Sequence, residues 1–300
     1  MSDPQTMRSG FVAIVGVPNA GKSTFFNRVL GFKLAITSDK PQTTRHRILG
    51  VYNQENLQMV FLDTPGLHQP RRALNKLMVE TALATLQEVD AVLFVVEAGI
   101  KGLDAGSKAA GVLTACGKPV VLALSKIDLL PDKAALLPML EEVSAWGDWA
   151  AMVPISAQKG DGTRQVVAEL VRRLPLGGPL FPVGTITDLS ERFLVGELIR
   201  EKVFRLTERE VPYSVAVTVD QLLEPAEDGH PTAVTATIHV ERGGQKAIII
   251  GKGGAMLKKI GTAARLDMER LLGGPVFLDL FVRVEPKWSH QDRSLRKLGY

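Results

Sequence analysis

The chain of 300 residues is long enough for two domains of ordinary size, each with its own core. Hydrophobic residues make up 45% of it and charged residues 23%, which excludes a collagen, a coiled coil and a disordered chain. No apolar run reaches the roughly eighteen residues that a membrane-spanning helix needs, and Met1 to Gly10 lacks the apolar core of a signal peptide. The single cysteine, Cys116, excludes an intrachain disulfide and fits a reducing cytosol.

The net charge of +4 is unevenly distributed along the chain. Residues 181–241 carry five basic and eleven acidic residues, whereas residues 242–300 carry twelve basic and five acidic ones. Between Arg242 and Leu266 there are six basic residues and no acidic one. A basic surface of this kind favours a polyanionic partner, and an ordinary solvated face explains the charge alone equally well.

The first half of the chain alternates short apolar runs with amphipathic stretches. The apolar runs predict buried strands at Phe11–Gly16, Met59–Asp63, Ala91–Val96, Val120–Ser125 and Met152–Ile155. The amphipathic stretches predict helices at Lys22–Gly31, Leu74–Glu88, Asp104–Ala115, Ala134–Trp146 and Thr163–Leu174. This alternation predicts an α/β fold with a mainly parallel sheet, and Arg47–Asn53 with Leu57–Asp63 predicts one antiparallel hairpin.

The alternation stops at Leu174–Pro182, where three prolines and two glycines in nine residues predict a linker. Beyond it we expect a smaller α+β domain, with helices at Leu189–Leu206 and Ala255–Leu272 and strands at Tyr213–Leu223, Ala233–Glu241 and Val276–Val284. The predicted boundaries are a first domain over residues 8–175, a linker over 176–187, and a second domain over 188–300 that includes a C-terminal tail.

A phosphate-binding loop follows the first predicted strand. The sequence Gly16-Val-Pro-Asn-Ala-Gly-Lys-Ser23 matches G-x-x-x-x-G-K-[ST] in full and opens a helix, which is the context that this motif requires. Backbone N–H groups of the loop and the helix N-terminus would surround the phosphates of a nucleotide, with Lys22 on the β- and γ-phosphates and Ser23 on Mg²⁺. The predicted nucleotide contacts are Pro18, Asn19, Ala20, Gly21, Lys22, Ser23 and Thr24.

Three later motifs indicate that the bound nucleotide is GTP or GDP and not ATP. Asp63-Thr-Pro-Gly66 ends a strand, so Asp63 would hold Mg²⁺ through water and the Gly66 N–H would face the γ-phosphate. In Ser125-Lys126-Ile-Asp128 the Asp128 carboxylate can accept hydrogen bonds from guanine N1–H and the 2-amino group, which adenine does not offer. Ser156-Ala157 follows the last strand, where a backbone N–H can donate to guanine O6.

At this point the chain resembles the translation-factor-related superclass of GTPases. Its base-reading motif is usually Asn-Lys-x-Asp, and the Asn ties this loop to the phosphate loop. Here Ser125 replaces that Asn. Since serine is shorter, we expect a lower affinity with an unchanged preference for guanine.

The polar stretch Lys33–Arg47 contains the predicted first switch. In related GTPases a threonine here closes over Mg²⁺ and the γ-phosphate, and Thr44 is our choice, with Thr43 as the alternative. The position that carries a water-orienting Gln in Ras-like proteins is Leu67, so we expect slow hydrolysis. Two remedies remain open, an external activator or a K⁺ ion held by Asn19. His68, Arg71 and Arg72 follow, with no assigned role.

The second domain contains Gly251-Lys252-Gly253-Gly254, a G-x-x-G loop with a basic interior. It lies after an apolar run and before an amphipathic helix, and the element order resembles a type II KH domain, whose loop clamps the backbone of single-stranded nucleic acid. A plain turn between helices is the alternative. The predicted RNA-binding residues are Gly251, Lys252, Gly253, Gly254, Lys258 and Lys259.

The two halves together resemble the Era family of bacterial ribosome-assembly GTPases over nearly the whole chain. The resemblance rests on Gly16–Ser23, Pro41–Arg47 with its Thr-Thr-Arg-His-Arg sequence, Asp63–Leu67, Glu191–Phe193, Glu197–Lys202 and Ile248–Gly254. It implies a slow GTPase that binds the 3′ end of the small-subunit (16S) rRNA and assists maturation of the 30S subunit. It also implies a monomer in the cytoplasm, partly peripheral at the inner membrane.

Two other functions compete with this interpretation. One is a metabolic P-loop kinase, which would leave Asp63–Gly66 and Ser125–Asp128 without a role. The other is a regulatory GTPase that acts on a protein or membrane partner and uses the KH-like domain for docking. RNA binding would separate it from a ribosome-assembly GTPase.

Overall fold

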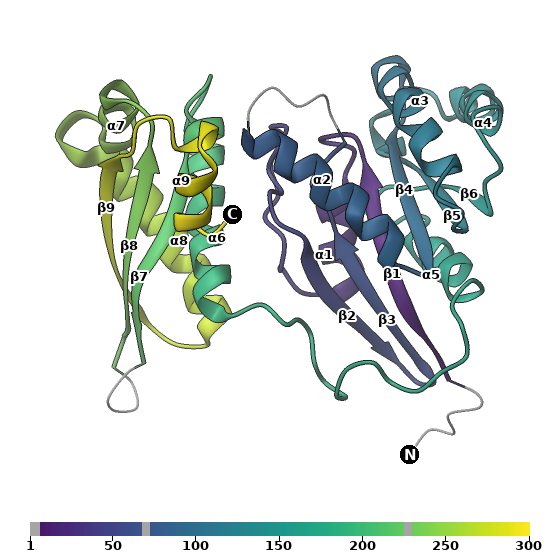
Figure 1. Cartoon of the computed structure of the whole chain (residues 1–300), viewed down its shortest axis with the longest axis horizontal. Helices are drawn as coiled ribbons and strands as arrows, with labels where there is room; N and C mark the ends of the chain where they lie inside the picture. Colours follow the sequence, from purple (N-terminus) through teal and green to yellow (C-terminus); the bar gives the residue numbers. More distant parts are fainter. Residues whose placement is uncertain (1–6, 68–72, 225–229) are drawn as a thin grey trace. The chain divides into compact units, whose positions relative to one another are not determined.

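A computed structural model describes residues 7–67, 73–224 and 230–300 of the chain. These residues form two compact units, and the chain passes from the first to the second between Asp188 and Leu189 (Figure 1). Within the described residues no helix is long and apolar enough to cross a membrane.

The first unit contains a six-stranded sheet of order β2-β3-β1-β4-β5-β6. Only β2 is antiparallel to its neighbour, as the predicted hairpin requires, and the other strands are parallel. The parallel strands read as continuous apolar runs because helices cover both faces of the sheet. The strands are β1 (Arg8–Gly16), β2 (Ile48–Gln54), β3 (Leu57–Asp63), β4 (Ala91–Glu97), β5 (Val120–Ser125) and β6 (Ala151–Pro154).

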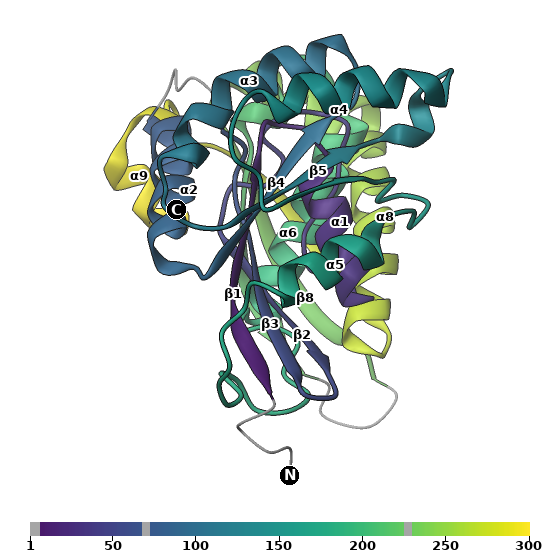
Figure 2. The ribbon, with the colours of Figure 1, turned by 90° about the vertical axis from the view of Figure 1, so that its right-hand side faces the viewer.

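In the described residues five α-helices flank this sheet, with α1 and α5 on one face and α2, α3 and α4 on the other (Figure 2). Side chains that alternate along β1 show the division, since Ala13 and Val15 belong to the core that includes Leu103 and Leu113 of α3. On the opposite face the ring of Phe25, from α1, packs edge-on against Phe61. The helices are α1 (Lys22–Leu30), α2 (Ala73–Glu88), α3 (Ile100–Thr114), α4 (Leu136–Ser144) and α5 (Thr163–Val171).

Residues 176–187, the predicted linker, lie along the first unit, and we call them the strap. The buried side chain of Gln58, in β3, accepts hydrogen bonds from the N–H groups of Leu180 and Phe181 and donates to the Phe181 carbonyl. Farther along, the Val51 N–H donates to the Ile186 carbonyl at 2.8 Å. The Thr187 hydroxyl donates to the Leu49 carbonyl at 2.6 Å. The strap is therefore hydrogen-bonded to β2 and β3 over most of its length.

The second unit has a three-stranded sheet of order β7-β8-β9, in which β8 pairs antiparallel with β7 and parallel with β9. Its core combines alternate residues of β8, such as Ala236 and Ile238, with Ile199 of α6 and Ile260 of α8. The elements are α6 (Glu191–Leu206), β7 (Ala216–Leu223), β8 (Thr232–Val240), α7 (Gly243–Ile250), α8 (Ala255–Leu272) and β9 (Val276–Val284).

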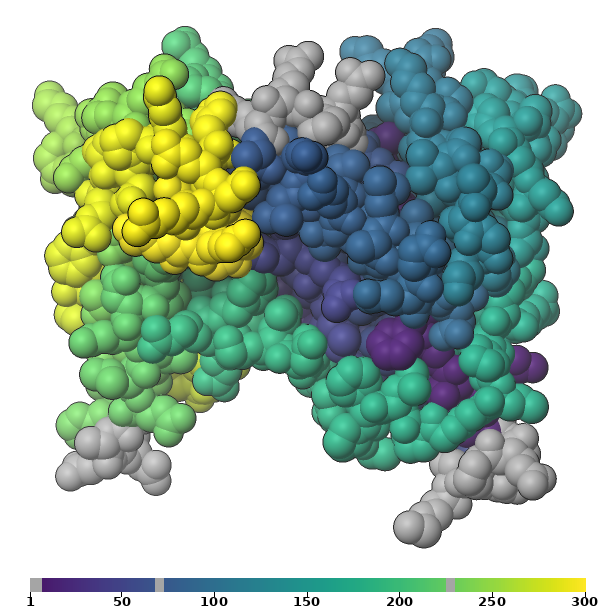
Figure 3. Space-filling view, in the orientation of Figure 1, coloured from purple at the N-terminus to yellow at the C-terminus, as the bar shows by residue number. Residues whose placement is uncertain are grey.

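Two helices of the second unit were not expected from the sequence. The apolar run before the G-x-x-G loop belongs to the helix α7, which begins at Gly243. The C-terminal tail forms a further short helix, α9 (Asp292–Lys297), beside the buried Trp288, whose ring stacks on Tyr300. Figure 3 shows these last residues, in yellow, as a continuous part of the surface.

Some predicted boundaries were displaced. Strand β1 begins at Arg8, three residues before its apolar run, and α3 begins at Ile100 instead of Asp104. Strand β1 starts with Arg8, Ser9 and Gly10, and α3 starts with an exposed Ile100 followed by Lys101 and Gly102, so hydrophobic periodicity does not mark these starts.

Candidate functional site

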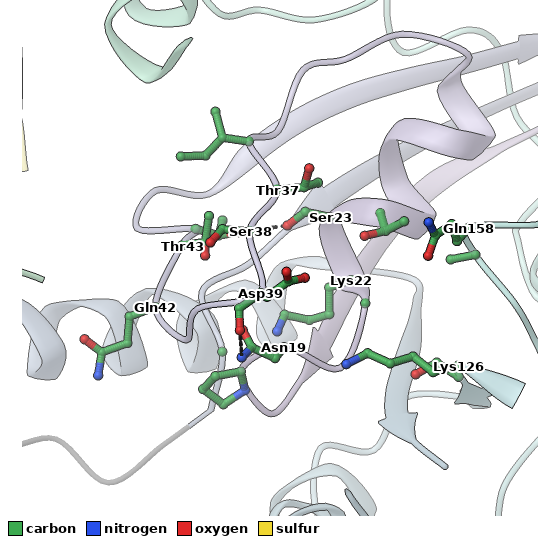
Figure 4. A pocket seen from close by; sticks show the side chains of 18 of the residues that line it. Asn19, Lys22, Ser23, Thr37, Ser38, Asp39, Gln42, Thr43, Lys126 and Gln158 are labelled. Atoms are coloured by element: carbon green, nitrogen blue, oxygen red, sulfur yellow. Dashed lines mark hydrogen bonds between the residues drawn. The ribbon is translucent and has the colours of Figure 1, made fainter. Parts of the chain in front are cut away.

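A cavity of about 240 Å³ lies in the first unit where the parallel strands end. It is lined by the phosphate loop, by the stretch from Ile36 to Thr44, by Gly66, and by the two loops that follow β5 and β6 (Figure 4). Ligands of open α/β sheets bind at this edge, because the loops after neighbouring strands converge there. All three predicted guanine-nucleotide motifs therefore border one cavity.

Lys22 is held inside the phosphate loop. Its ammonium donates to the carbonyls of Gly16 at 3.2 Å and Val17 at 3.0 Å, and the residue is 6% exposed. Burial lowers the pKa of Lys22 to about 8, and the nearby Asp63 carboxylate opposes this shift. Gly16 makes the cradle possible, since a Cβ there would lie 2.2 Å from the Val95 carbonyl oxygen.

Ser23, Thr44 and Asp63 converge at one end of the phosphate loop. The Ser23 hydroxyl lies 2.8 Å from the Thr44 hydroxyl and donates to Asp63 Oδ2 at 2.7 Å. Asp63 Oδ1 is buried and has no hydrogen-bond partner among the described residues. Burial raises the pKa of Asp63 to about 6, against the effects of Lys22 and of hydrogen bonds from Ser23 and Thr44. Three hard oxygen ligands with one free carboxylate oxygen fit Mg²⁺.

The structure distinguishes the two candidate threonines of the first switch. The Thr43 hydroxyl donates to the Lys40 carbonyl at 2.7 Å, whereas Thr44 lies beside Ser23. Leu67 packs against the apolar core, where it has no group that could orient water. Gly66 lies against the phosphate loop, since a Cβ on it would come within 2.8 Å of the Pro18 nitrogen. His68, Arg71 and Arg72 are outside the described residues.

Asn19 joins the phosphate loop to the first switch. Its side-chain amide donates to the Asp39 carbonyl at 2.6 Å, and both residues are labelled in Figure 4. The contact brings an amide side chain and a backbone carbonyl together at the cavity wall. Oxygens of both kinds are suitable ligands for a monovalent cation.

At the base end of the cavity, Ser125 does reach the phosphate loop. Its hydroxyl is buried and donates to the Ala20 carbonyl at 2.5 Å, so serine keeps the tie between the two loops despite its shorter side chain. The expected lower affinity stays a prediction. Lys126 has a left-handed backbone conformation and forms an ion pair with Glu97 at 2.8 Å. Asp128 follows in a short 3₁₀ turn and lines the cavity.

The loop after β6 begins with Ser156 and Ala157, and Ala157 also lines the cavity. The loop is a closed turn, in which the Ser156 N–H donates to the Asp161 carbonyl and the Lys159 N–H donates to the Ser156 hydroxyl. Arg28 of α1 contacts this turn from outside. The sequence analysis missed Arg28 and Glu97, because their partners are distant in the sequence and neither belongs to a motif.

The predicted RNA-binding residues form a separate surface in the second unit. The loop from Gly251 to Gly254 joins α7 to α8, and Lys252, Lys258 and Lys259 are all exposed. A Cβ at Gly253 would meet nothing within 4 Å, so the backbone of the loop is open to a ligand. This helix–loop–helix arrangement on a three-stranded sheet places a basic, accessible main chain at one end of α8.

Two protein families match the chain. Residues 11–126 match the family described as 50S ribosome-binding GTPase, and residues 210–289 match the KH domain. The second match covers the G-x-x-G loop and decides between a KH domain and a plain turn between helices.

Full-length relatives and solved structures agree with this division. The chain is 54% identical to GTPase Era of Geobacter metallireducens and 47% identical to GTPase Era of Stenotrophomonas maltophilia, over 100% of each chain. A structure of Aquifex aeolicus Era bound to GDP·AlF4⁻ matches with a TM-score of 0.92 and 39% identity, covering 98% of this chain and 99% of that one. Era in complex with MgGDPNP and nucleotides 1506–1542 of 16S ribosomal RNA matches with a TM-score of 0.93, 40% identity and the same coverage. The chain belongs to the Era family of GTPases, with a Ras-like P-loop domain followed by a KH domain.

Proposed function

We propose that the protein binds GTP with Mg²⁺, hydrolyses it slowly, and binds the 3′ end of the small-subunit (16S) rRNA during assembly of the 30S subunit. The observation that carries the nucleotide chemistry is the convergence of Ser23, Thr44 and Asp63 within hydrogen-bond distance of one another. These residues come from the phosphate loop, the first switch and the end of β3, which is the arrangement that a switch GTPase needs.

Each residue has a defined part in this chemistry. Backbone N–H groups of the phosphate loop and the Lys22 ammonium would bind the β- and γ-phosphates and stabilise negative charge as the bond breaks. Ser23 and Thr44 would ligate Mg²⁺ directly, and Asp63 would do so through water. The ion, when bound, supplies charge neutralisation at the phosphate oxygens. The Gly66 N–H would face the γ-phosphate. Thr44 would close over the same phosphate and Mg²⁺, so that loss of the γ-phosphate would release the first switch.

Leu67 stands at the position of the Gln that orients the attacking water in Ras-like proteins, and its side chain cannot do so, so we infer a slow intrinsic rate. We further propose that Asn19, beside the Asp39 carbonyl, provides an oxygen ligand for a K⁺ ion. Positive charge near the β–γ bridge would have the effect of an arginine finger.

Guanine would be recognised by two loops. Asp128 would accept hydrogen bonds from N1–H and the 2-amino group, with the Lys126 side chain beside the base. A backbone N–H of the Ser156-Ala157 loop would donate to O6. The proposal is supported by the position of both loops on the cavity that the phosphate loop and the first switch also line.

We assign RNA binding to the loop Gly251–Gly254 together with Lys258 and Lys259. A solved relative is named as a complex with nucleotides of 16S rRNA, and its chain matches this one over both units. The proposed domains are the GTPase domain at 8–175, the linker at 176–187 and the KH domain with the C-terminal tail at 188–300. Action as a cytoplasmic monomer follows from this proposal, and loose association with the inner membrane stays a prediction.

A gel-shift experiment with an RNA of the 16S 3′ end tests the proposed partner. Gly253→Asp places a carboxylate where phosphates would approach, and its φ of +58° is one that Asp tolerates. Gly273→Asp is the matched control, because Gly273 is also exposed, has φ +72°, and lies at the other end of α8.

We expect Gly253→Asp to abolish the shift and Gly273→Asp to preserve it. Binding should also fall steeply with salt. Equal binding by both variants would favour the second candidate, a regulatory GTPase that uses the KH domain to dock on a protein or membrane. Hydrolysis of GTP without RNA should be the same in both variants.

A further inference from the structure

The last turn of α1 contacts the loop that follows β6. The Arg28 guanidinium donates from Nη2 to the Gln158 carbonyl at 2.9 Å. Gln158 comes directly after Ser156-Ala157 and lines the nucleotide cavity, where Figure 4 labels it. Arg28, which does not line the cavity, therefore contacts the backbone of the loop proposed to read guanine O6.

A second contact shows how closely Arg28 fits this turn. A Cβ built on Gly160 would lie 3.0 Å from Arg28 Nη2, 3.2 Å from Nε and 3.4 Å from Cζ. The guanidinium of Arg28 therefore lies against the α-carbon of Gly160, and a side chain at position 160 would displace the guanidinium. Gly160 has a φ of +94°, which also favours glycine. Arg28 holds the turn at two points that are two residues apart.

The turn is rigid within itself. The Gly160 N–H donates to the Ser156 carbonyl at 2.7 Å, and the Thr163 hydroxyl donates to the Gly160 carbonyl at 2.8 Å. Because the turn is internally bonded, a force on Gln158 or Gly160 moves Ser156 and Ala157 as well. The position of the turn relative to the phosphate loop then depends on what it is tied to outside.

Besides the hydrogen bonds of the preceding Ile155 to Leu124 and Ile127, the turn has one outside tie among the described residues, to the helix that follows the phosphate loop. Helix α1 begins at Lys22 and ends at Leu30, so it carries the phosphate ligands at its first residues and Arg28 in its last turn. A nine-residue α-helix is about 14 Å long and stiff on this scale. One element therefore spans the distance between the phosphates and the loop at the base.

We propose that Arg28 is a positioning residue for guanine recognition. It holds the Ser156-Ala157 turn at the distance from the phosphate loop at which a backbone N–H meets the 6-oxo group of a bound guanine nucleotide. Arg28 does not touch the nucleotide and takes no part in hydrolysis. The inference rests on the proposed assignment of Ser156 and Ala157 to O6.

The test measures affinities for three diphosphates by competition with a fluorescent GDP. 6-Thio-GDP keeps N1–H and the 2-amino group but replaces O6 by a larger, weaker acceptor. Inosine diphosphate keeps O6 and N1–H but lacks the 2-amino group that Asp128 would bind. The factor by which each analogue binds more weakly than GDP is the penalty for one altered contact.

In the wild-type protein we expect each penalty to be about tenfold, as for the loss of one hydrogen bond. Arg28→Gln should bind GDP more weakly, with the 6-thio penalty reduced to about threefold or less and the inosine penalty unchanged. Arg28→Lys, which keeps one donor, should give an intermediate 6-thio penalty. Lys159→Gln is the matched control, because it removes the same charge from the loop that Arg28 contacts, and both penalties should persist.

An unchanged 6-thio penalty in Arg28→Gln would overturn the proposal. So would an equal reduction of both penalties, because that would show a general loosening of the cavity. The absence of any 6-thio penalty in the wild-type protein would instead show that Ser156 and Ala157 do not read O6, and the inference would fall with that assignment. The inosine penalty also reports that Arg28→Gln is folded.

Discussion

The hydroxyl of Ser125 donates to the carbonyl of Ala20 and thereby ties the base-reading loop to the phosphate loop. Both residues are fully buried, so the hydrogen bond lies away from water. A side chain with one donor and a short reach replaces the usual asparagine here because the two backbones approach closely. A Cβ on Gly21 would lie 3.9 Å from the Ser125 hydroxyl, which is an ordinary contact, so glycine is favoured there by its φ of +95°.

Removing this hydroxyl should weaken nucleotide binding. Ser125→Ala leaves the buried Ala20 carbonyl without its donor, which costs about 1 kcal/mol, or about five- to tenfold in the dissociation constant for GDP. The preference for GDP over ADP should be unchanged, since Asp128 is untouched. Competition titrations with both diphosphates measure the two quantities. Ser144→Ala, which removes an exposed hydroxyl from α4, is the control. If Ser125→Ala bound GDP as tightly as Ser144→Ala, the hydrogen bond to Ala20 would not contribute to nucleotide binding.

Asp128 should determine which base is accepted. In Asp128→Asn an amide donor replaces one carboxylate acceptor, so the variant loses a partner for the guanine 2-amino group and gains one for the 2-oxo group of xanthine. We expect GDP affinity to fall by at least about a hundredfold and xanthosine diphosphate to become the better ligand, because a mismatched buried polar group costs about 1–3 kcal/mol at each contact. If Asp128→Asn still bound GDP more tightly than xanthosine diphosphate, residue 128 would not contact the base.

Binding of Mg²⁺ should depend on pH through Asp63. The pKa of Asp63 is raised to about 6 by burial, and only the ionised carboxylate is a good ligand. Magnesium-dependent GDP binding should therefore strengthen as pH rises through about 6 and weaken about tenfold for each unit below that value. Isothermal titration at pH 5 and pH 7.5, with and without EDTA, measures this effect. A pH dependence of the same size in EDTA would show that another group titrates.

Potassium should stimulate hydrolysis if Asn19 supplies a ligand oxygen. We expect a faster phosphate release in KCl than in NaCl for the wild-type protein and no difference for Asn19→Ala. Asn19→Asp is the control, since it keeps a side-chain oxygen and tolerates the φ of +65° at this position. It should retain the stimulation even though it cannot donate to the Asp39 carbonyl. Equal wild-type rates in the two salts would contradict the proposal.

Gln58 should make a measurable contribution to the stability of the first unit. Gln58→Leu leaves the Leu180 and Phe181 N–H groups and the Phe181 carbonyl without their partner, and we expect a loss of about 2–3 kcal/mol in the free energy of unfolding. Gln54→Leu makes the same change at an exposed position of the same hairpin and should cost less than about 0.5 kcal/mol. Urea unfolding of both variants decides the point, and equal midpoints would mean that the strap is not held by this side chain.

Motifs that are contiguous in sequence predicted most of the nucleotide site. The phosphate loop, Gly66 and Asp128 all border the cavity, since the ends of neighbouring strands bring short motifs together. Whether Ser125 could reach Ala20 depends on the gap between two loops, which no local pattern reports. The role of Arg28 could not be predicted from the sequence for the same reason, because Arg28 lies 130 residues from its partner and donates to a backbone carbonyl.

Helix α7 shows a different limit of sequence reasoning. It begins with Gly243 and Gly244, which have poor helix propensity, so the pattern predicted only an apolar run. In the structure the Gln245 side chain accepts hydrogen bonds from the N–H groups of Glu241 and Arg242, which stabilises the start of the helix. Burial of Ile249 in the core adds tertiary stabilisation that outweighs the local cost.

The strap also fixes how long the tether between the two units is. With Thr187 bonded to Leu49, only Asp188, Leu189 and Ser190 remain before α6 begins at Glu191. Three residues reach at most about 10 Å, whereas a free segment from residue 176 onward would reach about 50 Å. A short tether raises the effective concentration of one domain for a ligand held by the other. While the strap is bound, the segment that joins the GTPase domain to the KH domain is therefore limited to these three residues.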